Sequence, residues 1–240
     1  KAAKETLEKI DQNFSGYLFT NLALGAGTIY RSQFENGDWK TAKINDGDVN
    51  NKVGGEYTGY TSTIDGRDKD HEEWVGYDLG RSKEFTRLTV YPSAAGTGYA
   101  YGMPRHFIIQ ASDDGAAWRT VNDTYSRESG NEFPLSGYGA YNFTLEEENG
   151  GAVNARYVRL FAQNLRPKAT DANYYYLQLT EMEVYNAVPQ TLAEAKTAVE
   201  QALERLVVSN GTTEEDVLAA AGKVVSNVAI AVGVEDFKKT

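Results

Sequence analysis

The stretch Phe107–Trp118 has the sequence FIIQASDDGAAW. Its apolar first half leads directly into Asp114-Gly115, a pair that favours a tight hairpin turn because glycine tolerates a positive φ. Trp118 follows the turn and is expected to carry a large aromatic side chain into a hydrophobic core. The stretch therefore predicts an antiparallel hairpin.

Short β-rich runs of the same kind recur through the middle of the chain. They lie at Trp74–Leu79, Thr86–Tyr91, His106–Ala111, Tyr141–Leu145, Arg156–Ala162 and Glu181–Tyr185. Strand alternation places Tyr157, Arg159 and Phe161 on one face of their run. The turn-forming pairs between runs are Asp46-Gly47, Asp65-Gly66, Asp114-Gly115 and Gly150-Gly151. No long helical pattern interrupts this region, so an all-β antiparallel sandwich is predicted rather than an α/β fold.

Both flanks of this region have helical spacing instead. Residues 1–14 are expected to form an N-terminal helical linker, because apolar side chains recur there on one helical face. Residues 188–240 carry a helical stripe that ends at Asn210-Gly211, and a capping box follows at Thr212–Glu215. They are expected to be a helical spacer or the start of a further module, which leaves residues 15–187 for the sandwich.

Composition excludes several classes of function. A net charge of -10 argues against a nucleic-acid partner, whose phosphates require clustered Lys and Arg. The absence of cysteine rules out disulfides, thiolate catalysis and Cys-based zinc sites. No stretch approaches the roughly 20 apolar residues of a membrane span, so membrane insertion is not expected. A bacterial surface protein fits this composition, although a cytosolic protein would share it. The chain is expected to be a segment of a longer protein.

Motifs for catalysis are missing from the sequence. The acidic runs Glu72-Glu73 and Glu146–Glu148 are adjacent residues on expected turns, and they are interpreted as solvated charges rather than two carboxylates across a cleft. No nucleophile elbow, phosphate loop or His-Glu-x-x-His pattern occurs. Only His71 and His106 could serve a histidine-based triad. The chain is therefore expected not to be an enzyme, and His71 is expected to anchor a loop.

Several segments follow one another in a recognisable order. They are Asn21–Gly25, Ala42–Gly47, Tyr57–Ser62, Trp74–Gly80, Phe107–Trp118, Ala155–Leu160 and Leu179–Tyr185. The series resembles the discoidin family, the coagulation factor V/VIII type C domains, and especially its bacterial branch, the family 32 carbohydrate-binding modules. The resemblance implies an eight-stranded, galactose-binding-domain-like jelly-roll sandwich with a structural calcium ion and a ligand site in loops at one end.

The same resemblance implies a function. It points to a non-catalytic module that binds a glycan and is tethered to other domains of a bacterial secreted or cell-surface protein, with a glycoside hydrolase as the favoured parent. The alternative is an adhesion module that binds a protein or another cell-surface partner. The extracellular setting is common to both interpretations.

A calcium ion takes about six to eight oxygen ligands, carboxylates and backbone carbonyls among them, often from a tight loop. The loop Lys43–Asp48 has two carboxylates around Gly47. Taken alone, these residues could equally be a plain turn, and Glu181 a solvated strand residue. The resemblance implies that the ligands are the Lys43 carbonyl and the side chains of Asp46, Asp48, Thr58 and Glu181.

Sugar binding requires an aromatic surface for the ring and planar polar groups for its hydroxyls. Two loops, 93–103 and 163–176, have this composition, and Trp39 with the stretch Asp65–His71 is expected to add a third wall. The expected ligand contacts are Trp39, Arg67, Tyr99, Tyr101, Asn164, Arg166, Tyr174 and Tyr175. For any one of these tyrosines, packing is as good an explanation. Galactose-binding relatives often have arginine where this chain has Ser93, so Arg166 or Arg67 would have to replace that contact and the sugar stays open.

Overall fold

A computed structural model of the chain describes residues 17–63, 69–93, 100, 102–135, 139–168 and 171–189. The chain divides into two compact units, Asn21–Tyr185, and Lys1–Thr20 together with Asn186–Thr240. The predicted helices at either end lie outside the described residues, except that residues 188–189 belong to a strand. Within the described ranges no helix is long and apolar enough to cross a membrane.

Strands dominate the described part of the chain. In chain order the elements are β1 (Tyr17–Asn21), β2 (Gly27–Tyr30), the short 3-10 helix η1 (Thr41–Ile44), β3 (Lys52–Val53), β4 (Glu56–Tyr57), β5 (Tyr60–Thr61), β6 (Glu73–Phe85), β7 (Arg87–Pro92), β8 (His106–Ser112), β9 (Arg119–Tyr125), β10 (Tyr141–Thr144), β11 (Val153–Asn164), β12 (Pro167–Lys168), β13 (Asp171–Tyr175) and β14 (Gln178–Pro189). Each of the six predicted β-rich runs coincides with a strand, namely β6, β7, β8, β10, β11 and β14.

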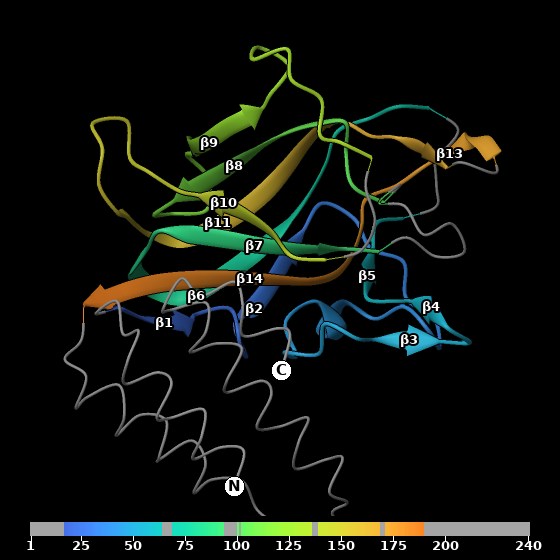
Figure 1. The fold of residues 1–240 in the computed structure, drawn as a ribbon, viewed down its shortest axis with the longest axis horizontal. Helices are drawn as coiled ribbons and strands as arrows, with labels where there is room; N and C mark the ends of the chain where they lie inside the picture. Colours follow the sequence, from blue (N-terminus) through green and yellow to red (C-terminus); the bar gives the residue numbers. More distant parts are fainter. Residues whose placement is uncertain are drawn as a thin grey trace, which may run out of the picture. The chain divides into compact units, whose positions relative to one another are not determined.

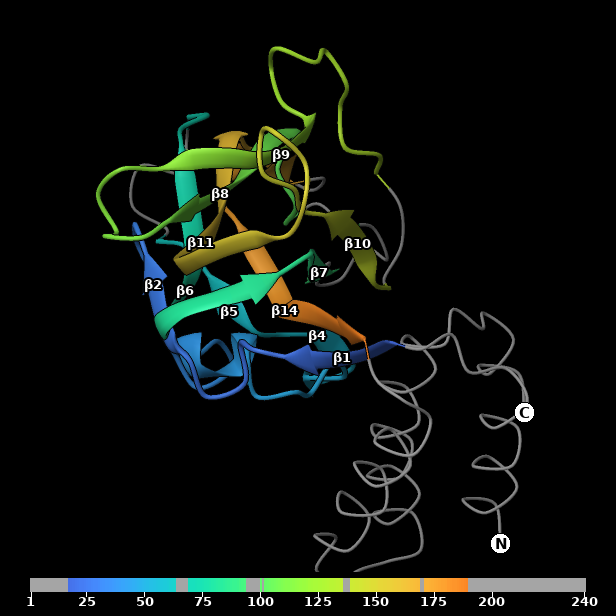
Figure 2. The same ribbon diagram turned by 90° about the vertical axis from the view of Figure 1, so that its left-hand side faces the viewer.

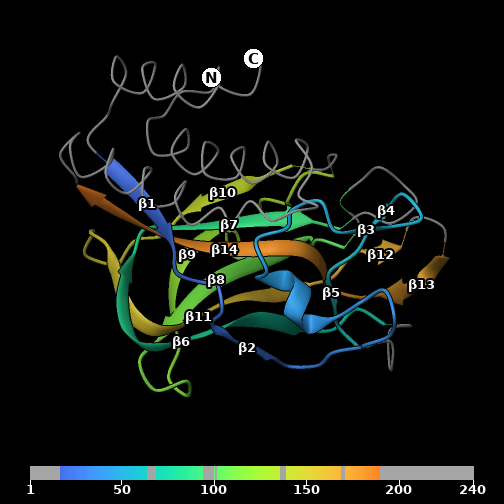
Figure 3. The ribbon, with the colours of Figure 1, turned by 90° about the horizontal axis from the view of Figure 1, so that it is seen from below.

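The long strands form two antiparallel sheets. One has the order β1-β14-β7-β10, with β5 also pairing β14, and the other has the order β2-β6-β11-β8-β9. Figure 3 shows them as two layers packed face to face, and Figure 2 shows the same layers turned. The predicted β-sandwich is therefore confirmed. Each sheet has five strands because short edge strands such as β5 join it, so the total exceeds the eight that the resemblance implied.

Strand register brings the ends of several strands together. Glu73 pairs with Ala162 and His106 with Asn164 in one sheet, and Leu179 pairs with Pro92 in the other. The starts of β6, β8 and β14 and the ends of β7 and β11 therefore share one end of the sandwich. We call it the loop end. It lies on the right in Figure 1, next to β5 and β13.

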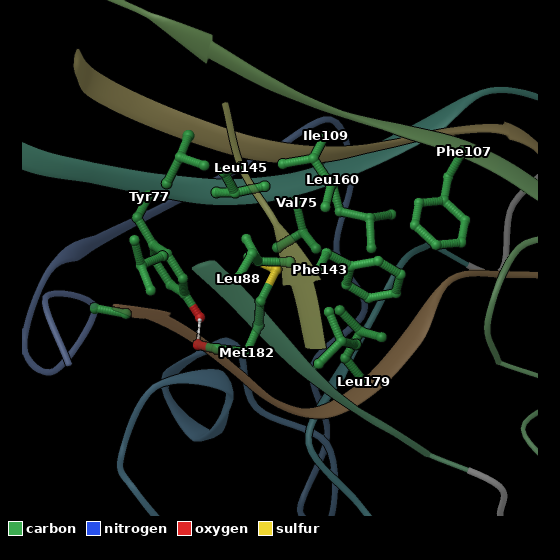
Figure 4. Close-up of a cluster of buried hydrophobic side chains, with 14 of the residues drawn as sticks. Val75, Tyr77, Leu88, Phe107, Ile109, Phe143, Leu145, Leu160, Leu179 and Met182 are labelled. Carbon is green, nitrogen blue, oxygen red and sulfur yellow. Dashed lines mark hydrogen bonds between the residues drawn. The ribbon is translucent and has the colours of Figure 1, made fainter. Parts of the chain in front are cut away.

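The core between the sheets is built by alternation along the strands. Fully buried side chains include Val75, Leu88, Ile109, Leu160 and Met182, and Figure 4 shows them converging from both layers. Burial of this apolar surface is the main stabilising contribution to such a fold.

Tyr77 adds a polar link inside this core. Its side chain is 0% exposed. The hydroxyl lies 2.6 Å from the carbonyl oxygen of Met182 in β14 and 3.0 Å from that of Ile44 in η1. Since Tyr77 belongs to β6, one hydroxyl connects the two sheets and the η1 segment (Figure 4).

The outer face of β11 carries a different cluster. Val158 and Leu160 point into the core, so Arg159 and Phe161 point outward, as alternation predicted. The Arg159 guanidinium lies 3.9 Å from the ring centre of Trp118, 5.0 Å from that of Phe161 and 5.1 Å from that of Trp74. Desolvation lowers the pKa of Arg159 to about 10.

This arrangement corrects one prediction about the hairpin of β8 and β9. The turn itself is confirmed, because Gly115 has a φ of +76° and the two strands pair. Trp118, however, does not enter the core. It is half-buried on the outer face beside Tyr157, with ring centres 6.5 Å apart, and stacking on Arg159 stabilises it there in place of full burial.

We predict that Tyr77→Phe lowers the free energy of unfolding by about 1–3 kcal/mol, because two buried carbonyls lose their shared donor while the ring stays. Urea denaturation measures this. The matched control is Tyr125→Phe, whose ring packs 5.7 Å from that of Phe107 and which is expected to change stability by less than about 0.5 kcal/mol. Equal effects of the two substitutions would contradict the structural role of the Tyr77 hydroxyl.

Candidate functional site

Segments far apart in the sequence are joined by hydrogen bonds at the loop end. The Asp70 carboxylate accepts from the Leu165 backbone N–H and from the Asn164 side chain, each at 2.7 Å. The backbone N–H of Phe133 donates to the Arg105 carbonyl at 2.9 Å. The backbone N–H of Arg105 also donates to the Asn164 carbonyl at 2.7 Å. Residues that precede β6, β8 and β10 are thereby attached to the end of β11 or to one another.

Asn164, an expected ligand residue, sits at the centre of these contacts. Besides donating to Asp70, its Oδ1 accepts from Arg127 Nε at 2.6 Å and lies 3.1 Å from His106 Nδ1. The Asn164 side chain thus contacts three residues, Asp70, Arg127 and His106. The contacts make Asn164 an anchor for three segments.

Arg166 has a similar position on the next segment. It is half-buried, and its Nη2 donates a hydrogen bond to the carbonyl of Phe133. Phe133 is itself buried, with its ring centre 4.8 Å from that of Tyr141 and 5.7 Å from that of Phe107. Arg166 thus anchors the segment Ser126–Leu135, which the sequence interpretation did not include. The segment contains a single aromatic residue, Phe133, so no periodic pattern in the sequence could have identified it.

The remaining expected sugar contacts are divided between the described and the undescribed residues. Tyr174 and Tyr175 are half-buried on β13, in the hairpin that β13 forms with β12 at the loop end. Trp39 is half-buried in a separate turn, which is closed by bonds between Trp39 and Asn36 of 2.9 and 3.0 Å. Arg67, Tyr99 and Tyr101 lie outside the described residues.

Ser93 occupies the position where galactose-binding relatives often have arginine. It is fully buried, and its Oγ donates to the Tyr57 carbonyl at 2.6 Å. The side chain therefore points into the protein and presents no donor to a ligand.

Glu73 corrects the expectation that the acids Glu72-Glu73 are both solvated. Glu72 precedes the strand, but Glu73 begins β6 and is 2% exposed. It shares the inward face with Val75 and Tyr77, because residues two apart in a strand lie on the same side. The expectation that His71 anchors a loop is confirmed, since its Nδ1 lies 2.8 Å from the Lys69 carbonyl.

Glu181 is the most unusual of the expected metal ligands. It is 0% exposed, and its Oε1 accepts from the Gly47 backbone N–H at 3.1 Å. Its Oε2 is buried and has no hydrogen-bond partner in the described part of the chain. Burial, together with the nearby charges of Glu183, Asp46 and Asp48, raises the pKa of the Glu181 carboxyl to about 9, while the hydrogen bond from Gly47 acts in the opposite direction. A buried carboxylate with an unsatisfied oxygen and acidic neighbours is suited to bind a cation.

The other expected metal ligands surround the same loop. Gly47 has a φ of +81°, which forms the tight turn, and Asp46 Oδ1 accepts from the Asp48 N–H at 2.8 Å. The Lys43 carbonyl accepts from Asn51 at 3.2 Å, while the Lys43 ammonium donates to Thr58 Oγ1 at 3.2 Å. Over the described ranges, no three Asp, Glu or His side chains converge as a metal cluster. A cation here would therefore depend on backbone and hydroxyl oxygens as well as carboxylates.

No curated protein is significantly similar in sequence to the chain. Among solved structures, CpGH89CBM32-5 from Clostridium perfringens, in complex with GalNAc-beta-1,3-galactose, is similar with 16% sequence identity, a TM-score of 0.51, and coverage of 70% of this chain and 100% of that chain. The family 32 CBM from C. perfringens NanJ, in complex with galactose, has 12% identity, a TM-score of 0.49, and coverage of 70% and 100%. Chitosan-binding module 1 from the chitosanase/glucanase of Paenibacillus sp. IK-5 has 21% identity, a TM-score of 0.46, and coverage of 70% and 99%.

At these identities the structural likeness concerns the fold. The family assignment comes from the sequence itself, because residues 28–180 match the family model of the F5/8 type C domain. This range is well over half of the chain, and it extends from β2 to the start of β14. It includes β3 to β13 in full, most of β2 and the first three residues of β14. The resemblance seen in the sequence is thus confirmed, and the chain belongs to the F5/8 type C domain family.

Proposed function

We propose that this chain is a non-catalytic carbohydrate-binding module of a larger bacterial secreted or cell-surface protein, with a glycoside hydrolase as the favoured parent. Its family and fold support this proposal, since the similar Clostridium perfringens structure was solved with GalNAc-beta-1,3-galactose. A glycan would bind through the loops at one end of the sandwich. The function resides in these loops, because the fold alone does not determine it.

The observation that carries the proposal is the chemistry of the loop end. Tyr174 and Tyr175 are half-buried on the β13 hairpin, so each ring retains some exposed surface. Arg166 and Asn164 lie on the preceding segment of the chain and are held by the bonds to Phe133 and Asp70. Aromatic surface beside anchored planar polar groups is the combination that binds sugar rings and their hydroxyls with little loss of conformational entropy.

A structural calcium ion is the second part of the proposal. The ligands would be the Lys43 carbonyl with Asp46, Asp48, Thr58 and Glu181. The buried, unsatisfied Oε2 of Glu181 supports it most directly. Thr58 could take part once the Lys43 ammonium has left its hydroxyl. The ion would neutralise the acidic loop and attach it to β14, which gives it a role in stability rather than in chemistry.

We expect Glu181→Gln to have opposite effects with and without calcium. In EGTA it should raise the free energy of unfolding by about 1–4 kcal/mol at neutral pH, because folding no longer has to protonate a carboxyl whose pKa in the folded protein is about 9. Saturating calcium should stabilise the unmodified protein by about 3 kcal/mol at a hundredfold excess over Kd, and the variant hardly at all. Thermal unfolding measures both effects. Glu148→Gln, at an exposed position, should behave like the unmodified protein. A calcium response that survives in the Glu181 variant would refute this ligand set.

Glycan binding is tested by a glycan array, followed by calorimetry on any glycan captured. Tyr175→Ala should weaken binding about tenfold or more, because an aromatic contact is lost. Glu84→Ala, at an exposed position on the far half of β6, should leave the affinity unchanged. A blank array together with capture of a defined protein ligand would replace the carbohydrate proposal by the adhesion alternative.

A further inference from the structure

A buried titratable cluster that the proposed function does not use lies at the loop end. Its centre is Glu73. Oε1 of this residue accepts from Ser32 Oγ at 2.7 Å and lies 3.6 Å from His71 Nε2. Oε2 is buried, and none of the described residues forms a hydrogen bond with it. Burial raises the pKa of the Glu73 carboxyl, while Ser32, His71 and Arg31 act in the opposite direction.

Three segments of the chain meet at this carboxylate. Ser32 follows β2, and its Oγ also accepts from the backbone N–H of Thr63, just after β5, at 3.0 Å. The Ser32 carbonyl accepts from the Tyr60 hydroxyl at 2.7 Å. His71 belongs to the segment before β6. Glu73 therefore connects, through Ser32 and His71, the segment that follows β2 with the residues just before β6 at the loop end.

The charged and titratable groups that face Glu73 are few. His71 is partly exposed, with 24% of its side-chain surface accessible. Arg31 is exposed, and its guanidinium donates to the Glu72 carbonyl and not to Glu73. Tyr60 is buried and neutral, because burial and the charge of Glu73 raise the pKa of its hydroxyl well above the ordinary value. Within the described surroundings of Glu73, His71 is thus the group placed to share a proton with its carboxylate.

Hydrogen bonding restricts where the protons of His71 can be. A carbonyl oxygen only accepts, so the contact between Nδ1 and the Lys69 carbonyl requires a proton on Nδ1. Nε2 then faces Oε1 of Glu73. That contact is attractive when one proton lies on either atom, and repulsive when both atoms present lone pairs. Loss of this proton would also leave a buried carboxylate without a neutralising partner, which is strongly unfavourable.

We propose that Glu73 is a proton-dependent positioning residue. The proton that it shares with His71 holds Ser32 and residues 69–72 in place, and thereby sets the geometry of this part of the loop end. The proton sharing stands independently of any ligand, whereas its effect on binding rests on the proposed glycan function.

The sign of the effect follows from the Glu73 carboxyl. Its pKa in the folded protein lies above the ordinary value of 4.5, so the folded state holds the proton more tightly than the unfolded chain does. The stability that this proton contributes is present at mildly acidic pH and is lost as the pH rises through the raised pKa. Ser32 and the residues just before β6 are therefore held most firmly when Glu73 and His71 share a proton.

The proton sharing is tested by following the Glu73 side-chain carboxyl carbon by NMR as a function of pH. In the unmodified protein its midpoint should lie above 4.5. His71→Phe keeps the burial and removes the cation, so the midpoint should rise by at least about half a unit. The control is His106→Phe, since His106 is the other histidine of the chain and faces the neutral Asn164 amide. It should not change the midpoint. Equal midpoints in all three proteins would overturn the proposal.

The positioning role is tested with Glu73→Gln, which keeps an acceptor for Ser32 and cannot ionise. The reporter is the hydrogen-exchange protection of the Thr63 amide, which donates to Ser32 Oγ. Protection in the unmodified protein should fall about threefold or more as the pH rises through the measured midpoint of the Glu73 carboxyl, and in the variant it should stay constant. Protection that is independent of pH in the unmodified protein, or that falls equally in the variant, would refute the role.

The effect on a ligand is measured with any glycan that the array captures. Its Kd should rise by about threefold in the unmodified protein as the pH rises through the same midpoint, and by less in Glu73→Gln. A blank array would reject the glycan function alone, because the carboxyl titration and the amide protection would still decide the role of Glu73.

Discussion

The buried hydroxyl of Tyr77 is the contact on which the arrangement of both sheets and the acidic loop depends. Its ring belongs to β6, while the carbonyls of Met182 and Ile44 belong to β14 and η1. Each of these carbonyls is removed from water, and an unsatisfied buried carbonyl costs about 1–3 kcal/mol. One hydroxyl therefore sets the separation of the layers at this point and fixes η1 against them. Gly47, three residues beyond η1, then reaches Glu181 on β14.

Strands with strong alternation could be predicted from the sequence, and weakly buried ones could not. In β11, Val158 and Leu160 are fully buried while Arg159 is not, which is the pattern that predicted the strand. β9 was predicted only as the second strand of the hairpin and not as a β-rich run, because it is an edge strand in which only Val121 is buried, so its sequence carries almost no periodic signal. Trp118 was placed on the wrong side because a turn identified from Asp114-Gly115 does not fix the face on which the next aromatic residue lies.

Composition identified the loops of the candidate site but not the partners within them. The partners of Asn164 are Asp70, Arg127 and His106, which lie 94, 37 and 58 positions away in the sequence. Such contacts depend on how the strands are ordered in the sheets, and no local pattern encodes them. Glu73 is a different case, because the sequence already placed it on the same face of the strand as Val75 and Tyr77. It was nevertheless predicted to be solvated because of its charge, although a buried acid with a neutralising partner is physically acceptable.

Glu73 and Glu181 show how one physical problem is met at two places in this fold. Both carboxylates are buried, and each has an oxygen with no hydrogen-bond partner among the residues that the structure describes. Glu73 has a histidine beside it, so a shared proton can neutralise it. Glu181 has Asp46 and Asp48 beside it, so a proton must stay on the carboxyl unless a metal cation replaces it. In both places neutralisation of charge holds loops to strands, where apolar packing holds the strands to one another. Protons and cations can therefore alter the loops while the core, whose stability comes from Val75, Leu160 and their neighbours, stays unchanged.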